Sequence, residues 1–106
     1  LLVEDKRFNL ENTLQLKDNY NRNILFYSIE NNNIEMTKLI LKSNNVDVNL
    51  IDKNGKSPLF IAFESWRCEM EMIKLLVEDK RFNLENTLQL KDYYNRNILF
   101  YSIQNN

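Results

Sequence analysis

Two long segments of the chain are almost the same. Residues 1–32 return as residues 75–106, displaced by 74 positions, and 30 of the 32 positions are identical. The two exceptions pair Asn19 with Tyr93 and Glu30 with Gln104. Segments this similar are expected to fold in the same way, and a unit that returns at a fixed spacing is typical of stacked repeats. The sequence therefore predicts a repeat array.

A shorter period lies within this displacement. Three aspartates, Asp18, Asp52 and Asp92, open similar segments and are 34 and 40 residues apart. After Asp52 comes Ser57-Pro58-Leu59-Phe60-Ile61-Ala62, which resembles the T-P-L-H-x-A motif at the start of the first helix of an ankyrin repeat. Weaker versions occupy residues 23–28 and 97–102, and residues 44–49 resemble the end of such a repeat.

The resemblance to ankyrin repeats covers essentially the whole chain. It implies an all-α, ankyrin-type helix-turn-helix solenoid with short hairpin or loop fingers. On this reading, residues 1–17 are the tail of a preceding repeat and its connection, residues 18–51 and 52–91 are two repeats, of which the second has longer connections, and residues 92–106 are the first helix of a further repeat.

The residue types support helices at these positions. Ser57 supplies an oxygen that can cap free N–H groups, and Pro58 suits the first helical position because its missing N–H costs nothing there. Asn23 and Asn97 are expected to cap in the same way. Within residues 34–42 the apolar and charged side chains separate onto two faces, which predicts a short amphipathic helix. Helices this short are expected to depend on stacking for their stability.

Asparagine stands where ankyrin repeats usually have glycine in their turns. The chain has one glycine, Gly55, and 18 asparagines. Among the non-glycine residues, asparagine enters the left-handed region most readily. We therefore expect left-handed turns at Asn21, Asn32, Asn44 and Asn95. A compositional bias toward asparagine is an alternative explanation for the total, but it does not explain the placement at the turns.

Two further departures from the family pattern affect packing and loops. The motif histidine is replaced by Phe26, Phe60 and Phe100, which predicts apolar contacts in place of a hydrogen-bond network between repeats. The second repeat has two extra residues between its helices, near Ser65 and Trp66, and about five in the connection that follows. That connection, residues 83–92, is either a lengthened finger or a small ordered loop.

Several classes of chemistry are disfavoured. Fourteen basic and fifteen acidic residues leave a net charge of -1, without the basic excess typical of nucleic-acid binding. No histidine, one cysteine and one glycine argue against a metal centre, a cofactor and a phosphate loop. No apolar run is long enough for direct membrane insertion. We therefore expect no catalytic residue, no metal and no cofactor.

Two groups of residues have both a functional and a structural interpretation. Cys68 lies beside Arg67, which could lower the pKa of the thiol, but an inert thiol in a reducing compartment is the default. The alternating charges at residues 4–7 and 78–81 are interpreted as solvated helix ends. Because an inert free thiol is typical of a reducing compartment, we expect the chain to be intracellular, in the cytoplasm.

Exposed aromatic and arginine side chains are the best candidates for binding another protein. The alternative is that these rings pack against the adjoining repeat. The expected partner-binding residues, in the groove and at the finger tips, are Tyr20, Arg22, Tyr27, Trp66, Tyr93, Tyr94, Arg96 and Tyr101.

The predicted function is a protein–protein interaction scaffold that presents a concave groove to a partner protein. One alternative is a regulatory or docking ankyrin segment of a longer enzyme or membrane protein, and another is a structural spacer. Because helices of neighbouring repeats stack, the fragment is also expected to be able to stack end to end on copies of itself.

Overall fold

The computed structural model of the chain describes residues 10–82 and residue 91. Within that part all regular structure is helical, and no strand occurs. The helices are α1 (Leu10–Leu14), α2 (Ile24–Glu30), α3 (Ile34–Leu41), α4 (Pro58–Glu64) and α5 (Met70–Glu78). The expected unit 18–51 thus contains α2 and α3, and the expected unit 52–91 contains α4 and α5.

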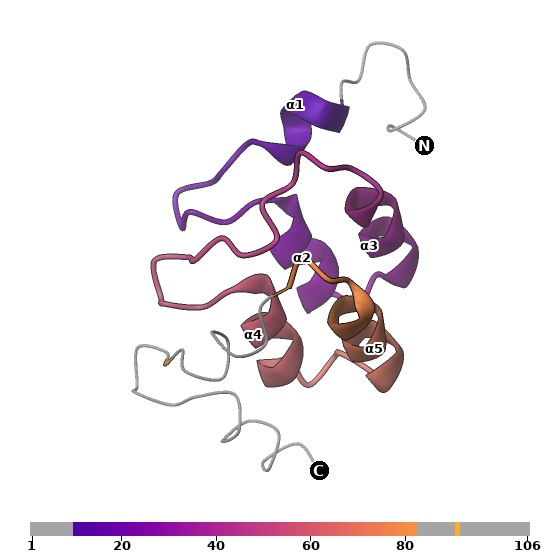
Figure 1. Cartoon of the computed structure of the whole chain (residues 1–106). Helices are drawn as coiled ribbons and strands as arrows, with labels where there is room; N and C mark the ends of the chain where they lie inside the picture. Colours follow the sequence, from indigo (N-terminus) through magenta and orange to yellow (C-terminus); the bar gives the residue numbers. More distant parts are fainter. Residues whose placement is uncertain (1–9, 83–90, 92–106) are drawn as a thin grey trace.

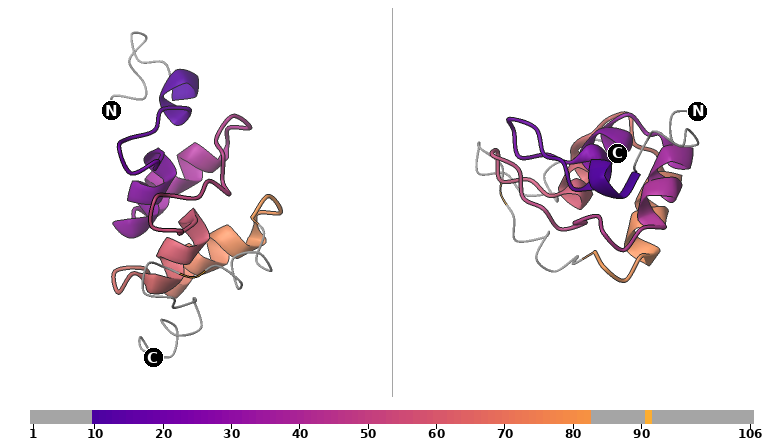
Figure 2. Two further views of the ribbon diagram at one scale, coloured as in Figure 1. Left: turned by 90° about the vertical axis from the view of Figure 1, so that its left-hand side faces the viewer. Right: turned by 90° about the horizontal axis from the view of Figure 1, so that it is seen from above.

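The helices form two layers. The first helices of the two units, α2 and α4, pack side by side, and so do the second helices, α3 and α5 (Figure 1). Each first helix also packs against the second helix of its own unit. Figure 2 shows that the loops before α2 and α4 project away from both layers on the same side. This is the helix-turn-helix stack that the repeat pattern predicts.

The turn between α2 and α3 is made by asparagine. Asn32 adopts the left-handed conformation expected from the sequence, with φ of 53°. The side chain of Asn33 caps α3 by accepting a hydrogen bond from the N–H of Met36. Between the helices, the buried hydroxyls of Ser28 and Thr37 lie 2.9 Å apart and share a hydrogen bond. Both polar groups are thereby satisfied inside the core.

The start of α4 is as predicted. The hydroxyl of Ser57 accepts a hydrogen bond from the N–H of Phe60 at 3.2 Å, and Pro58 is the first helical residue. The loop between α4 and α5 spans residues 65–69, two residues more than the loop 31–33 between α2 and α3. The expected insertion between the helices of the second repeat is therefore confirmed.

The core lies between the layers and extends under the connection 42–51. Phe26 and Phe60, which replace the family's motif histidine, are both completely buried. Phe26 packs in an apolar cluster with residues from every described helix, so the apolar packing that the sequence predicted is confirmed for this ring. Among the described residues, the large aliphatic side chains that are fully buried are Leu14, Leu25, Ile29, Ile40, Leu59, Ile61, Met72 and Leu76.

Two tight turns make the projecting loops, and we call residues 18–22 finger 1 and residues 52–56 finger 2. In finger 1 the carboxylate of Asp18 accepts hydrogen bonds from the N–H groups of Tyr20 and Arg22. The carboxylate of Asp52 does the same for the second and fourth residues after it. The fourth residue of each finger, Asn21 or Gly55, has positive φ, of 62° and 82°. Asn21 therefore stands where the other finger has glycine.

Two expectations about local structure are wrong, and one helix was not predicted. Asn23 occupies the N-cap position of α2 but makes no capping bond, because its amide donates to the carbonyl oxygen of Asp47, a group of the connection 42–51. Asn44 does not have positive φ; that turn is supported instead by the hydroxyl of Ser43, which accepts from the N–H of Asn45. The helix α1 was not expected within residues 1–17. Asn95, Asn97, Phe100 and the connection 83–92, apart from residue 91, lie outside the described residues.

Candidate functional site

The candidate residues that the structure describes do not form one cluster. Tyr20, in finger 1, is 61% exposed, and Tyr27, on α2, is half-buried. Arg22 is largely buried, with 13% of its side chain exposed. Trp66 is 80% exposed, but it lies in the loop after α4, whereas finger 2 precedes α4. The remaining candidates, Tyr93, Tyr94, Arg96 and Tyr101, lie outside the described residues.

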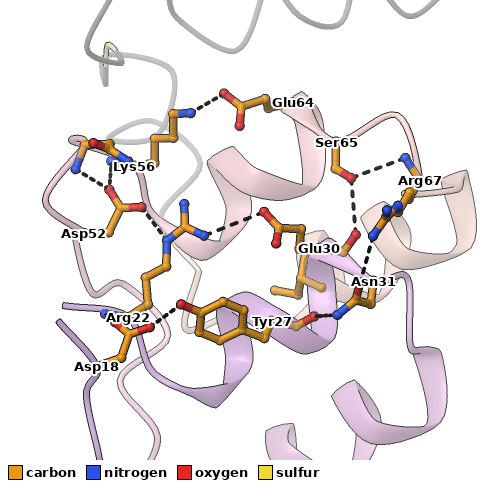
Figure 3. A network of polar contacts seen from close by, with 12 residues as sticks. Asp18, Arg22, Tyr27, Glu30, Asn31, Asp52, Lys56, Glu64, Ser65 and Arg67 are labelled. Carbon is orange, nitrogen blue, oxygen red and sulfur yellow. Dashed lines mark hydrogen bonds and ion pairs between the residues drawn. The ribbon is translucent and has the colours of Figure 1, made fainter. Parts of the chain in front are cut away.

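Arg22 joins the two repeats. Its Nε donates a hydrogen bond to Oδ2 of Asp52 at 2.8 Å, and its Nη1 lies 3.6 Å from the carboxylate of Glu30 (Figure 3). Its guanidinium carbon lies 5.4 Å from the ring centre of Phe26 and 5.8 Å from that of Tyr27. The side chain of Asp52 is fully buried by this contact. The guanidinium is therefore engaged within the protein rather than held out toward solvent.

Finger 2 repeats part of this arrangement. Lys56, the residue equivalent to Arg22, forms an ion pair with Glu64 at 2.6 Å and lies 6.0 Å from the ring centre of Phe60. The acid stands eight residues after the cation in both units, and Figure 3 shows the two ion pairs. An aspartate, a cation four residues later and a glutamate eight residues after that is the sequence signal that could have revealed these pairs.

Tyr27 is tied to finger 1. Its hydroxyl donates a hydrogen bond to Oδ2 of Asp18, and the ring lies beside Arg22 (Figure 3). This hydrogen bond lowers the pKa of Asp18 and raises the pKa of Tyr27. The tyrosine is consequently held in one orientation on the finger side of α2, where part of the ring is accessible.

The fingers themselves are joined by hydrogen bonds. The N–H of Lys53 donates to the carbonyl oxygen of Tyr20 at 3.0 Å, and the side-chain amide of Asn21 donates to the carbonyl oxygen of Ile51 at 2.9 Å. Only the backbone of Tyr20 takes part, so its ring remains exposed. The result is a surface on which the exposed tyrosine is carried by a fixed backbone.

Trp66 belongs to a second surface, at the end of α4. The guanidinium of Arg67 lies 5.3 Å from its ring centre and donates a hydrogen bond to Oδ1 of Asn31 at 3.1 Å. The loop is anchored to the end of α2, because the hydroxyl of Ser65 donates to the carbonyl of Glu30 (Figure 3). In addition, the N–H of Glu69 donates to Oδ1 of Asn32. An exposed tryptophan thus stands on an anchored loop.

Cys68 is not an activated thiol. Its Sγ donates a hydrogen bond to the carbonyl oxygen of Ile29 at 2.9 Å, and burial raises its pKa. Arg67, which could have lowered the pKa, is directed to Trp66 and Asn31 instead. Of the two interpretations of this cysteine, the structure favours the inert thiol.

The interpretation of residues 78–81 as a solvated helix end is wrong for two of them. Arg81 donates to the carbonyl oxygens of Leu41 and Ser43, at 2.6 and 2.7 Å, and pairs with Asp79. Its hydrogen bonds to the carboxylate lower the pKa of Asp79. The reason is that the end of α3 leaves carbonyl groups without helical partners, and the neighbouring unit supplies a cation to them. Glu78 and Lys80 are exposed, as expected.

The described part of the chain shows neither a metal-binding cluster nor a membrane-spanning helix. There, no three His, Cys, Asp or Glu side chains are placed so that they could hold a metal ion. A shallow hollow of about 450 Å³ lies between α3 and α5, on the layer away from α2 and α4, and it is lined by Lys38, Leu41, Lys42, Leu75, Glu78 and Asp79. None of the described helices has both the length and the apolar character needed to cross a membrane.

Comparison with known proteins agrees with this architecture. A search of curated proteins finds no match to the chain. The family model described as ankyrin repeats (3 copies) matches residues 1–86, which is most of the chain. Proteins with ankyrin repeats generally mediate protein–protein interaction and are typically not catalytic. With its two-layer stack of helix pairs and its projecting fingers, the chain belongs to the ankyrin repeat family.

Proposed function

We propose that the chain is a non-catalytic scaffold that binds another protein through the finger side of α2 and α4. The observation that carries the proposal is that hydrogen bonds hold finger 1 and finger 2 together while Tyr20 stays 61% exposed. Exposed aromatic side chains on a fixed backbone are effective anchors because little conformational freedom is lost on binding. Tyr27 is the neighbouring anchor on α2.

Arg22 has a supporting role in this proposal. Its guanidinium holds finger 1 to Asp52, so it fixes the spacing between the anchors instead of contacting the partner. Trp66 is a second contact point, at the other end of α4. The sequence extends the proposed surface to residues outside the described part: Tyr93, Tyr94, Arg96 and Tyr101.

The experiment is site-specific photo-crosslinking in cells. A photoreactive phenylalanine analogue replaces Tyr20 or Trp66 in one pair of variants, and Lys38 or Lys74 in the control pair. The control lysines are also exposed, but they lie on α3 and α5. The proposal expects one protein to be captured from positions 20 and 66 and not from positions 38 and 74.

Binding of the captured protein is then measured with purified variants. Truncating an aromatic anchor typically weakens binding by about 2 kcal/mol, or roughly thirtyfold. We expect such losses for Tyr20→Ala and Trp66→Ala, and changes within about twofold for Lys38→Ala and Lys74→Ala. Circular dichroism confirms that each variant keeps its helices. If only the lysine variants lost binding, the proposal would be wrong and the binding surface would lie on α3 and α5.

A further inference from the structure

Finger 2 contains an asparagine that is followed directly by glycine, Asn54 before Gly55. No other asparagine of the sequence precedes a glycine. The order of these two residues matters chemically, because the backbone nitrogen of a glycine is not shielded by a neighbouring Cβ atom. Such a nitrogen can approach the side-chain carbonyl carbon of the asparagine before it.

The reaction open to this pair is deamidation. The backbone nitrogen of Gly55 loses its proton to hydroxide from the solvent and forms a bond to Cγ of Asn54, and the side-chain nitrogen takes up a proton and leaves as ammonia. Water then opens the resulting cyclic imide at either of its two carbonyl groups. The product is aspartate or isoaspartate, whose backbone runs through the side chain. One water is consumed and one ammonia is released, without oxidation or reduction.

The side chain of Asn54 is accessible to this reaction. Asn54 is exposed, and its side-chain amide has no hydrogen-bond partner among the described residues. Gly55 has φ of 82°, and a Cβ atom on it would lie 2.9 Å from the carbonyl oxygen of Lys91. A side chain at position 55 would therefore be strained. The turn of finger 2 thus requires the same glycine that makes Asn54 reactive.

The backbone nitrogen of Gly55 is held inside the turn. Its N–H donates a hydrogen bond to the carbonyl oxygen of Asp52 at 3.1 Å. The carboxylate of Asp52 accepts from the N–H groups on either side, those of Asn54 and Lys56, both at 2.9 Å. A nitrogen whose proton is donated within a closed turn is not available to attack Cγ. The reaction therefore requires finger 2 to open.

Finger 1 keeps this turn closed. Nε of Arg22 donates to the carboxylate of Asp52 at 2.8 Å (Figure 3), and the N–H of Lys53 donates to the carbonyl oxygen of Tyr20 at 3.0 Å. Local opening is an equilibrium whose population depends on the contacts that must break. Removing a contact with finger 1 therefore increases the population in which the nitrogen of Gly55 is released.

We propose that Asn54 is a site of spontaneous deamidation, and that the contact between finger 2 and finger 1 sets the rate of this reaction. The co-reactant is water from the solvent. Either product places a new carboxylate two residues after Asp52, and isoaspartate also adds an atom to the backbone of the turn. The contact between the fingers thus protects the covalent structure of finger 2. The proposal does not depend on the binding of another protein.

The test is a time course of peptide mapping by mass spectrometry on the full chain in mildly alkaline buffer. Conversion of the side chain changes its mass by the difference between an NH₂ and an OH group. We expect Asn54 to be converted before the other asparagines, and roughly tenfold faster in guanidinium chloride than in native buffer. Asn21 is an internal reference, because its amide donates to the carbonyl oxygen of Ile51 and it precedes a residue with a side chain.

Substitutions test the role of finger 1. Arg22→Gln loosens the contact between the fingers, and we expect the native rate to rise about fivefold, as for the loss of one hydrogen bond. Arg67→Gln, the same change in the loop before α5, is the matched control and should leave the rate unchanged. Asn54→Gln should remove the modification, because the longer side chain must close a larger ring. Circular dichroism checks the fold, and Asn21→Gly replaces Arg22→Gln if that variant loses its helices.

A core variant separates the opening of finger 2 from unfolding of the whole chain. Ile40→Val removes a methyl group from a buried side chain of α3 and lowers the overall stability. If Asn54 reacted only in the unfolded chain, its native rate would rise in Ile40→Val as well. We expect the rate of this variant to equal that of the wild type.

Four results would overturn the proposal. They are an Asn54 that stays intact in guanidinium chloride, equal rates in native and denaturing buffer, Arg22→Gln reacting no faster than Arg67→Gln, and an acceleration in Ile40→Val as large as that in Arg22→Gln. None of these results bears on the binding of another protein through Tyr20 or Trp66.

Discussion

The side-chain amide of Asn21 donates a hydrogen bond to the carbonyl oxygen of Ile51 at 2.9 Å. Asn21 also has φ of 62°, a conformation that glycine adopts without cost. One residue therefore does two things that a glycine could not do together. It makes the tight turn of finger 1, and it holds finger 1 to the segment that begins finger 2.

Substitutions of Asn21 should separate these two contributions. Asn21→Gly keeps the turn and loses the hydrogen bond, which should cost about 1 kcal/mol of unfolding free energy. Asn21→Ala also strains the turn, which should cost about 1 kcal/mol more. Urea unfolding followed by circular dichroism measures both. If Asn21→Gly were as stable as the wild type, the amide would contribute nothing to the stacking of the fingers.

Arg22 should matter more for stability than its equivalent, Lys56. Arg22→Ala leaves the buried carboxylate of Asp52 without its cation, and removing one partner of a buried pair typically costs about 3 kcal/mol. Lys56→Ala breaks a pair whose two side chains are both partly exposed, so the loss should be at most about 1 kcal/mol. Arg22→Gln is a milder variant if Arg22→Ala does not fold. Equal losses for Arg22→Ala and Lys56→Ala would contradict the special role of the contact with Asp52.

The pair of Asp79 and Arg81 should contribute to acid sensitivity. Hydrogen bonds from Arg81 lower the pKa of Asp79 in the folded protein. Such a carboxylate stabilises the fold above its unfolded pKa of about 3.9, and this contribution is lost as the pH falls through the lower folded value. In Asp79→Asn the fall in the urea midpoint below about pH 4 should therefore be less steep than in the wild type. Identical slopes would mean that the contact with Arg81 does not lower the pKa of Asp79.

The thiol of Cys68 should react slowly in the folded protein. Burial raises the pKa of the thiol, so little thiolate is present near neutral pH. In addition, its Sγ donates a hydrogen bond to the carbonyl oxygen of Ile29. A colorimetric disulfide reagent should modify it at least tenfold faster in denaturing urea. Arg67→Ala should leave the native rate nearly unchanged, because Arg67 does not lower this pKa. A native rate that equalled the unfolded rate would show an accessible, activated cysteine.

The sequence predicts local conformations, such as helix caps and left-handed turns. It does not predict hydrogen-bond partners that come from distant segments. Ser57, Pro58, Asn21 and Asn32 take the conformations expected of them, because a cap or a left-handed turn depends on neighbouring residues. Asn23 does not, because its Nδ2 donates to the carbonyl oxygen of Asp47, 24 residues away, and this contact orients the side chain.

The candidate site shows the same division. Tyr20 and Trp66 are exposed, as their positions at a turn and in an insertion indicated. Arg22 and Arg81 have residue types typical of a surface, yet the stacking of one unit on the next buries much of both side chains. Their partners lie in the neighbouring unit, at positions that depend on how two helix pairs pack. That packing cannot be read from the residues that flank each arginine.

The helix α2 is tied to the next repeat at both of its ends. Before its first turn the finger contacts reach residues 51–53, and after its last turn the loop 65–69 holds it through Cys68 and Ser65. Because α2 has only seven residues and is held at both ends, we expect that it does not fray from one end while α4 stays folded. In hydrogen-exchange terms, the amides of α2 and α4 should open in one concerted event, so that these two repeats form a single cooperative folding unit.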